Sequence, residues 1–202
     1  RRQRQMCIRD RLYAKQRRLI HLVTDQIYEK EKNNRMMTGI LSQIVEFRNG
    51  ESGLHVLHIN ILTQLLLEKL MRKSENYDLS WSQQHMIATA SALHDIGKIG
   101  IDEKILNKPG KLTKEEFEAM KQHTIIGARM LDRLKMYHDE EMMKYAYEIC
   151  RWHHERYDGR GYPDGLKGEE IPVSAQVVAL ADVYDALAVS YTHLTLPTNS
   201  RV

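Results

Sequence analysis

The residues best suited to chemistry in this chain of 202 residues are histidines and aspartates that recur at regular intervals. They are His94 and Asp95, followed at steps of 29 or 30 residues by His123, His153 and Asp182. In a bundle of antiparallel helices joined by short turns, such steps bring the chain back to the same end of the bundle each time. We therefore expect these side chains to converge on one pocket.

Three further residues extend this set. Glu51 and His55 lie four positions apart, on one face of a helical turn, and His154 directly follows His153. Imidazole and carboxylate ligands together suit transition metals, and this many ligands exceed what one ion takes. The pattern predicts two or three divalent ions, with Fe, Mn, Co and Zn all suited to these ligands. A single histidine is more often an ordinary core or surface residue, so the prediction depends on the joint pattern.

The elements that must position these residues are helices. Apolar residues recur with helical spacing, and no segment shows the sustained alternation of a strand, so the sequence predicts an all-α fold. The motifs SWSQ at 80–83 and TKEE at 113–116 have the form of capping boxes that open helices. We expect helices over 54–71, after Ser80, and near 113–136, 139–156 and 172–190.

His94 and Asp95 come at the end of the helix that follows Ser80. Neighbouring residues on a helix point about 100° apart. The pair can therefore serve one ion only if it lies at a helix end, or else it bridges two ions.

A heptad seam marks the first part of the chain. Apolar residues alternate at steps of three and four, with polar Lys30 and Asn34 as interruptions, over Ile20, Val23, Ile27, Met37, Leu41 and Ile44. This pattern is typical of a helix that pairs with a second copy of itself and joins an upstream domain. The alternative is a first helix that packs on its own domain. Gly50 and Gly53 break or loosen this helix.

Composition and charge argue against some functions. The fractions of 42% hydrophobic and 28% charged residues are those of a globular protein. Without residues 1–11 and 190–202, 24 basic and 26 acidic residues remain of 30 and 27, so the net charge of +3 does not favour DNA binding. No apolar run could span a bilayer or serve as a signal peptide. Cys7 and Cys150 form no disulfide or metal framework, which favours the reducing cytoplasm.

The two ends look foreign to the rest of the chain. RRQRQMCIRDR at 1–11 and SYTHLTLPTNSRV at 190–202 resemble translated cloning read-through, which does not belong to a natural fold. The alternative is a basic arm and an ordinary C-terminal tail.

The motifs together resemble an HD-GYP domain, a subgroup of the HD phosphohydrolase superfamily. The resemblance runs from about Ile44 to Ala188 and rests on FRNGESGLHVLHI, LHDIGKIGI, ILNKPGKLTKEEFEAMKQHTIIGARML, HHERYDGRGYPDGLKGEEIP and ALADVYDAL. It implies an HD-type helical bundle over 47–189, preceded by a linker or signalling helix over 12–46. After DALAVS the family continues with an Arg- and Lys-bearing stretch that contacts substrate. Here YTHLTLPTNSRV replaces it, so the domain is expected to be incomplete at its C-terminal end.

The resemblance also implies a role for each site residue. The implied metal ligands are Glu51, His55, His94, Asp95, His123, His153, His154 and Asp182. Asp95 is expected to bridge two ions, and Glu51 with His55 to support a third. Lys98 is expected near the scissile phosphate, where a cation neutralises developing charge. Taken alone, Lys98 would be a solvated lysine at a helix end.

The loop after His154 completes the expected site. Its glycines, Gly159 and Gly161, let the backbone approach a ligand closely, and Pro163 limits the loop's freedom. Tyr162 offers a ring and a hydroxyl to a guanine or a phosphate. We expect substrate contacts from Lys98, Gly161, Tyr162 and Pro163. The alternative is a simple turn between helices.

Members of this family hydrolyse cyclic di-GMP, a bacterial second messenger, or related cyclic dinucleotides. The resemblance therefore implies a metal-dependent phosphodiesterase that linearises cyclic di-GMP. Two alternatives stay open: hydrolysis of another cyclic dinucleotide, and a dinucleotide-binding or protein-docking module without turnover. The expected partners are the cyclic dinucleotide, a second copy of the chain bound through the N-terminal helix, and an upstream sensory or receiver domain.

Overall fold

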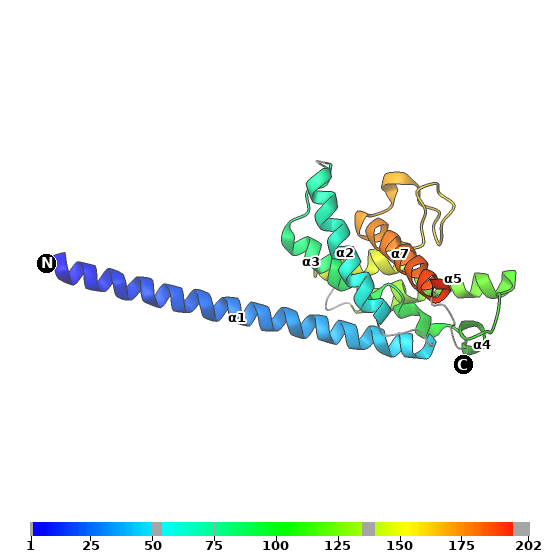
Figure 1. Ribbon diagram of the computed structural model, residues 1–202, viewed down its shortest axis with the longest axis horizontal. Helices are drawn as coiled ribbons and strands as arrows, with labels where there is room; N and C mark the ends of the chain where they lie inside the picture. Colours follow the sequence, from blue (N-terminus) through cyan, green and yellow to red (C-terminus); the bar gives the residue numbers. More distant parts are fainter. Residues whose placement is uncertain (1, 50–53, 75, 135–139, 196–202) are drawn as a thin grey trace, which may run out of the picture. The chain divides into compact units, whose positions relative to one another are not determined.

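The computed structural model describes residues 2–49, 54–74, 76–134 and 140–195 of the chain. Within these ranges the regular elements are helices only (Figure 1), which confirms the predicted all-α class. The α-helices are α1 Arg2–Asn49, α2 Leu54–Lys73, α3 Trp81–Ala90, α4 Glu103–Leu106, α5 Lys114–Asp132, α6 Glu141–Trp152 and α7 Val173–Thr195. The 3-10 helices are η1 Ser91–Leu93, η2 Ile96–Gly100 and η4 Gly168–Glu170. The chain divides into two compact units, Arg1–Met37 and Thr38–Val202.

The heptad seam of α1 is exposed to solvent in the single chain. In the first unit, Ile20, Val23 and Ile27 are between 46% and 56% exposed, and in the second unit Leu41 and Ile44 are 52% and 60% exposed. Side chains of this size bury their apolar surface where a neighbour is available. Pairing of this seam with a second copy stays a prediction.

The last turns of α1 use a different face to contact the domain. Thr38, Ser42 and Val45 are buried, and the Oγ of Ser42 donates a hydrogen bond to the carbonyl of Ala92. The guanidinium of Arg48 donates to the carbonyls of two residues in and after η2. The alternative prediction, a first helix that packs on its own domain, therefore holds for one face of the last turns of α1. The domain boundary expected at residue 47 stays a prediction.

Five helices surround the core of the second unit. Helix α2 packs on α3 and α7, and α6 packs on α3, α5 and α7. Their fully buried side chains meet in the centre and include Ile59 and Leu67 of α2, Ile87 of α3, Ile149 of α6 and Val178 of α7. Cys150, in the same cluster, is a buried free cysteine.

Both predicted capping boxes are present. The hydroxyl of Ser80 accepts the N–H of Gln83 at 3.2 Å, and the side chain of Gln83 accepts the N–H of Ser80 at 2.9 Å. Thr113 and Glu116 make the same reciprocal pair at 3.2 and 2.7 Å. These bonds satisfy backbone donors that the first turn of a helix leaves free, so α3 and α5 begin where the sequence predicts.

The helix predicted at 139–156 was too long. Helix α6 spans Glu141–Trp152, with His153 as its C-cap, and the chain then turns so that the N–H of Tyr162 donates to the carbonyl of His154. The helix was predicted too long because its end depends on a contact with Tyr162, eight residues beyond His154, which helical periodicity does not reveal. Helix α5 likewise ends at Asp132 instead of 136, while α7 continues past residue 190 to Thr195.

Two glycines allow η2 to lie directly on α5. A Cβ placed on Gly97 would be 1.8 Å from the carbonyl oxygen of His123, and one on Gly127 would be 3.0 Å from the backbone nitrogen of Gly97. Neither approach leaves room for any side chain. This contact fixes the segment that carries Asp95 against the helix that carries His123.

Candidate metal centre

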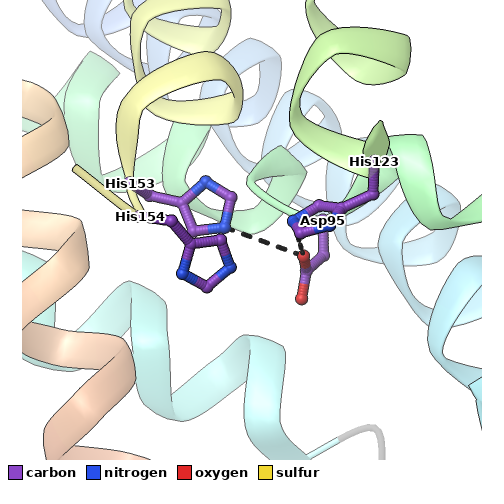
Figure 2. Close-up of side chains that lie close together, drawn as sticks. All are labelled: Asp95, His123, His153 and His154. Carbon is purple, nitrogen blue, oxygen red and sulfur yellow. Dashed lines mark ion pairs between the residues drawn. The ribbon is translucent and has the colours of Figure 1, made fainter. Parts of the chain in front are cut away.

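The described residues contain two adjoining groups of metal-binding side chains. One consists of Asp95, His123, His153 and His154, and the other of His55, His94 and Asp182. Within each group, one ligand atom per residue lies within 4.8 Å of all the others. Figure 2 shows the first group, in which histidines from α5 and from the end of α6 point toward the carboxylate of Asp95. The predicted convergence is therefore seen for seven of the eight proposed ligands.

Asp95 lies at the centre of the contacts. Its Oδ1 is 3.3 Å from the Nε2 of His123 and 3.8 Å from the Nε2 of His153, and its Oδ2 is 3.2 Å from the Nε2 of His94. His94 belongs to the second group, where the Nε2 of His55 is 3.7 Å from the Oδ1 of Asp182. The His94 and Asp95 pair thus joins the two groups into one centre.

Three of the histidines are oriented by their own helical turns. The Nδ1 atoms of His94, His123 and His153 lie 2.9, 2.7 and 2.9 Å from the carbonyl oxygens of Ser91, Met120 and Ile149. A carbonyl can only accept, so each Nδ1 carries the proton. In the neutral form of each ring, the Nε2 carries no proton and can bind an ion at the centre, which is the usual arrangement of a metal-ligating histidine.

Several polar atoms that face the centre are buried and lack hydrogen-bond partners among the described residues, and a bound cation would satisfy them. The Nε2 atoms of His94, His123 and His153 and the Oδ1 of Asp95 are buried and have no partner in hydrogen-bonding geometry within the described ranges. Burying polar atoms without partners costs about 1 to 3 kcal/mol each. A divalent ion would satisfy all four, and a donor set of nitrogen and oxygen suits Fe, Mn, Co, Ni or Zn better than Ca or Mg.

The protonation states also suit a metal centre. Burial lowers the pKa of His123 and His153 and brings that of His154 to about 3, so these rings are neutral at pH 7. Burial acts to raise the pKa of Asp95, but the charges of His94 and Lys98 outweigh it and hold the pKa well below its usual range. Neutral imidazole and ionised carboxylate are the forms that bind metal.

His94 differs from the other rings. Burial acts to lower its pKa, but the charge of Asp95 outweighs burial and raises the pKa to about 9. Without a cation nearby, His94 therefore carries a second proton, on its Nε2, at pH 7. An ion that binds its Nε2 must displace this proton.

Lys98 lies at the edge of the centre. Its Nζ is 2.8 Å from the Oδ2 of Asp95, and its side chain is 16% exposed. Lys98 is therefore a largely buried lysine paired with Asp95, and not the solvated lysine that its position at a helix end would suggest. Its role toward a phosphate stays a prediction.

The glycine-rich loop packs directly on His154. The ring of Tyr162 stacks on the imidazole of His154, with centroids 4.7 Å apart and planes at 28°. A Cβ on Gly161 would lie 2.4 Å from the Cα of Glu155, so the close approach here is to the chain's own backbone. Pro163 follows a cis peptide bond. The loop is thus part of the wall of the centre, and its contacts with substrate stay a prediction.

Of the other predicted residues, Glu51 lies outside the described residues, and Gly159 takes a φ of +76° that favours glycine. Three residues beside the centre were not predicted from the sequence, namely Glu155, Asp185 and His58. Glu155 accepts the N–H groups of residues 164 and 165 and so holds the loop, while Asp185 binds the rings of His55 and His58. The spacing of three between Asp182 and Asp185 places both on one face of a helix and could have identified the second carboxylate.

A family model described as an HD domain matches residues 54–198. Residues 54–198 are most of the chain, and the chain belongs to this family, as the motifs predicted. Membership implies that the centre binds divalent metal ions.

Three curated proteins illustrate the similarity. A probable cyclic di-GMP phosphodiesterase of Vibrio cholerae is 39% identical over 83% of this chain and 39% of its own length. A cyclic di-GMP phosphodiesterase of Thermotoga maritima is 45% identical over 73% of this chain and 37% of its own length. A 3′3′-cGAMP-specific phosphodiesterase 2 of Vibrio cholerae is 41% identical over 73% and 26%. The chain therefore spans about two fifths or less of these relatives.

Among the described residues, no helix combines the length and the apolar character that crossing a bilayer requires.

Proposed function

We propose that this chain is a metal-dependent phosphodiesterase that hydrolyses cyclic di-GMP in second-messenger signalling. The observation that carries the proposal is the set of buried, inward-facing atoms around Asp95, whose donor types suit divalent transition metals. Relatives named for cyclic di-GMP hydrolysis at 39% and 45% identity support this substrate class.

The proposed ligands are the seven residues of the two groups, with Asp95 as the bridge between two ions. Glu51 is proposed to complete a third site with His55. Fe or Mn is proposed for these ions. When bound, the ions supply an activated water and neutralise charge on the phosphate.

The chain's own residues are proposed to bind and orient the substrate. Lys98 holds a positive charge 2.8 Å from Asp95, where it can contact a phosphate oxygen of a substrate at the centre. Tyr162 is proposed to contact the dinucleotide through its hydroxyl, because its ring is already stacked on His154. Gly161 and Pro163 are proposed to shape this wall of the pocket.

At the level of the whole protein, we propose a homodimer through the seam of α1 and an upstream sensory or receiver domain. The exposed seam supports the first, and the length of the relatives beyond this chain supports the second. The cytoplasm as the place of action stays a prediction.

A substrate comparison tests the proposed function. The full chain, loaded with Mn²⁺ or Fe²⁺, is given cyclic di-GMP, 3′3′-cGAMP or the small diester bis-p-nitrophenyl phosphate, and products are separated by chromatography. We expect linear di-GMP as the fastest-formed product, and no product from a His123→Ala variant.

Two other results of this experiment would each favour a different function. Faster cleavage of 3′3′-cGAMP would favour a hybrid dinucleotide as the substrate, which one relative's name suggests. Tight binding of cyclic di-GMP by the fully loaded chain without any product would instead favour a binding module.

A further inference from the structure

One buried carboxylate contacts the centre without belonging to the predicted ligands. Asp185 is 4% exposed and lies on α7, three residues after Asp182. Its Oδ2 lies 2.7 Å from the Nδ1 of His55, and its Oδ1 lies 2.9 Å from the Nδ1 of His58. Both of its oxygens are thus engaged by histidines of α2.

These bonds determine which nitrogen of His55 can bind a metal ion. A carboxylate accepts hydrogen bonds, so the Nδ1 of His55 carries a proton and cannot be the ligand atom. The Nε2 is left, and it lies 3.7 Å from the Oδ1 of Asp182. His94, whose ring centroid is 5.6 Å from that of His55, completes this group.

Asp185 orients the ring of His55, as backbone carbonyls orient the rings of three other histidines. His94, His123 and His153 are each held by a carbonyl of their own helical turn. His55 is held by a side chain from another helix. That acceptor is charged, and hydrogen bonds to charged groups contribute about 1.5 to 3 kcal/mol, more than those to neutral groups.

We infer that Asp185 is the positioning residue for His55, and that it makes the group of His55, His94 and Asp182 competent to bind an ion. His58 holds the second oxygen and so fixes the rotation of the carboxylate. Because Asp182 and Asp185 share α7, one helix places both the ligand and the residue that orients its neighbour. The inference rests on the metal centre of the proposed function.

The test compares metal affinity in single and double variants. Chains freed of metal are dialysed against graded Mn²⁺, and bound ions per chain are counted by mass spectrometry. In Asp185→Asn, the amide oxygen accepts from only one histidine and carries no charge. We expect one of the ions to bind about 10- to 100-fold more weakly, the usual loss when such an outer residue is changed. The ion in the Asp95 group should bind within twofold of the parent.

A background without His55 separates positioning from a structural role. If Asp185 acts through His55, Asp185→Asn should cost less than twofold in metal affinity when His55→Ala is already present. An equal loss in both backgrounds would mean that Asp185 supports the fold, and no loss in the parent would mean that His55 needs no orientation. As a control, His58→Gln should weaken binding by less than the Asp185 change.

A spectroscopic measurement on the unaltered chain keeps the inference testable if the variants do not fold. In the Zn²⁺-loaded protein, nitrogen NMR of His55 should show a protonated Nδ1 and a metal-bound Nε2. A metal-bound Nδ1 would overturn the inference. Failure of cyclic di-GMP hydrolysis in the same sample would count against the proposed function and leave this result unaffected.

Discussion

At the scale of single residues, Asp95 shows how two neighbours in sequence can serve one centre. The sequence left two possibilities for His94 and Asp95, one shared ion at a helix end or two bridged ions, and Asp95 lies between η1 and η2 with φ −103° and ψ 11°. In this turn its two oxygens face different histidines, His94 and His123. A position inside a regular helix would have separated the two side chains.

Removing this carboxylate should disrupt the whole centre. In Asp95→Ala, we expect at least one ion per chain to be lost and hydrolysis to fall by more than about a hundredfold, because even outer residues cost roughly 10- to 100-fold. Metal analysis and circular dichroism of the same sample check that the fold is kept. Asp158→Ala, at a loop carboxylate that is 42% exposed, is the control and should change neither. Full metal content in Asp95→Ala would refute the bridging role.

Tyr162 allows the support of His154 to be separated from substrate contact. Tyr162→Phe keeps the ring on His154 and removes only the hydroxyl. We expect unchanged metal content and a kcat/KM for cyclic di-GMP about tenfold lower or more, from loss of a hydrogen bond to a charged phosphate. Tyr157→Phe, on an exposed tyrosine of the same loop, should match the parent. If Tyr162→Phe also matches it, Tyr162 only supports the wall of the centre.

At the scale of elements, local signals predicted the helices well and distant contacts poorly. Capping boxes at Ser80 and Thr113 gave the starts of α3 and α5, because their bonds join residues three apart. The end of α6 was misjudged, since Tyr162 and Gly161 fold back on residues 154 and 155. The packing of η2 on α5 was not predicted either, because nothing local marks Gly97 as a contact point.

The contact at Gly97 should be intolerant of any side chain. Gly97→Ala would place a methyl group 1.8 Å from the carbonyl oxygen of His123, so η2 must move away from α5. Overpacking costs about 1 to 3 kcal/mol, and a backbone clash belongs at the upper end. Urea unfolding measures the loss in the free energy of unfolding. Gly39→Ala, with nothing within 4 Å, should be neutral or stabilise by up to about 1 kcal/mol. Equal stabilities for the two variants would contradict the close approach.

The seam of α1 gives a prediction about association. Ile27 and Leu41 are 55% and 52% exposed, so lysines there should leave the folded chain unchanged. In a paired helix the same positions are buried, and a charge on each should abolish dimers. Sedimentation of the parent and of the Ile27→Lys, Leu41→Lys double variant measures this. A parent that is monomeric at every concentration tested would end the hypothesis.

At the scale of the whole molecule, regular spacing made most of the centre predictable. Steps of 29 or 30 residues bring His94, His123, His153 and Asp182 to one centre. Only the step from His123 to His153 runs out along one helix, α5, and back along the next, α6, whereas the other two steps return through short helices and loops. Glu155 and Asp185 were missed, since they bind the loop and other ligands instead of facing the centre. Residues that orient other side chains are therefore harder to predict from sequence spacing than the metal ligands themselves.

The most direct test follows metal occupancy and chemistry in one sample. The chain is stripped of metal and titrated with Mn²⁺ or Fe²⁺ without oxygen, while bound ions per chain and hydrolysis of cyclic di-GMP are measured at each step. We predict no hydrolysis in the stripped chain, and an activity that rises with occupancy until at least two ions are bound per chain. Hydrolysis that persists without metal, or a chain with two bound ions that cleaves no cyclic dinucleotide, would contradict the account.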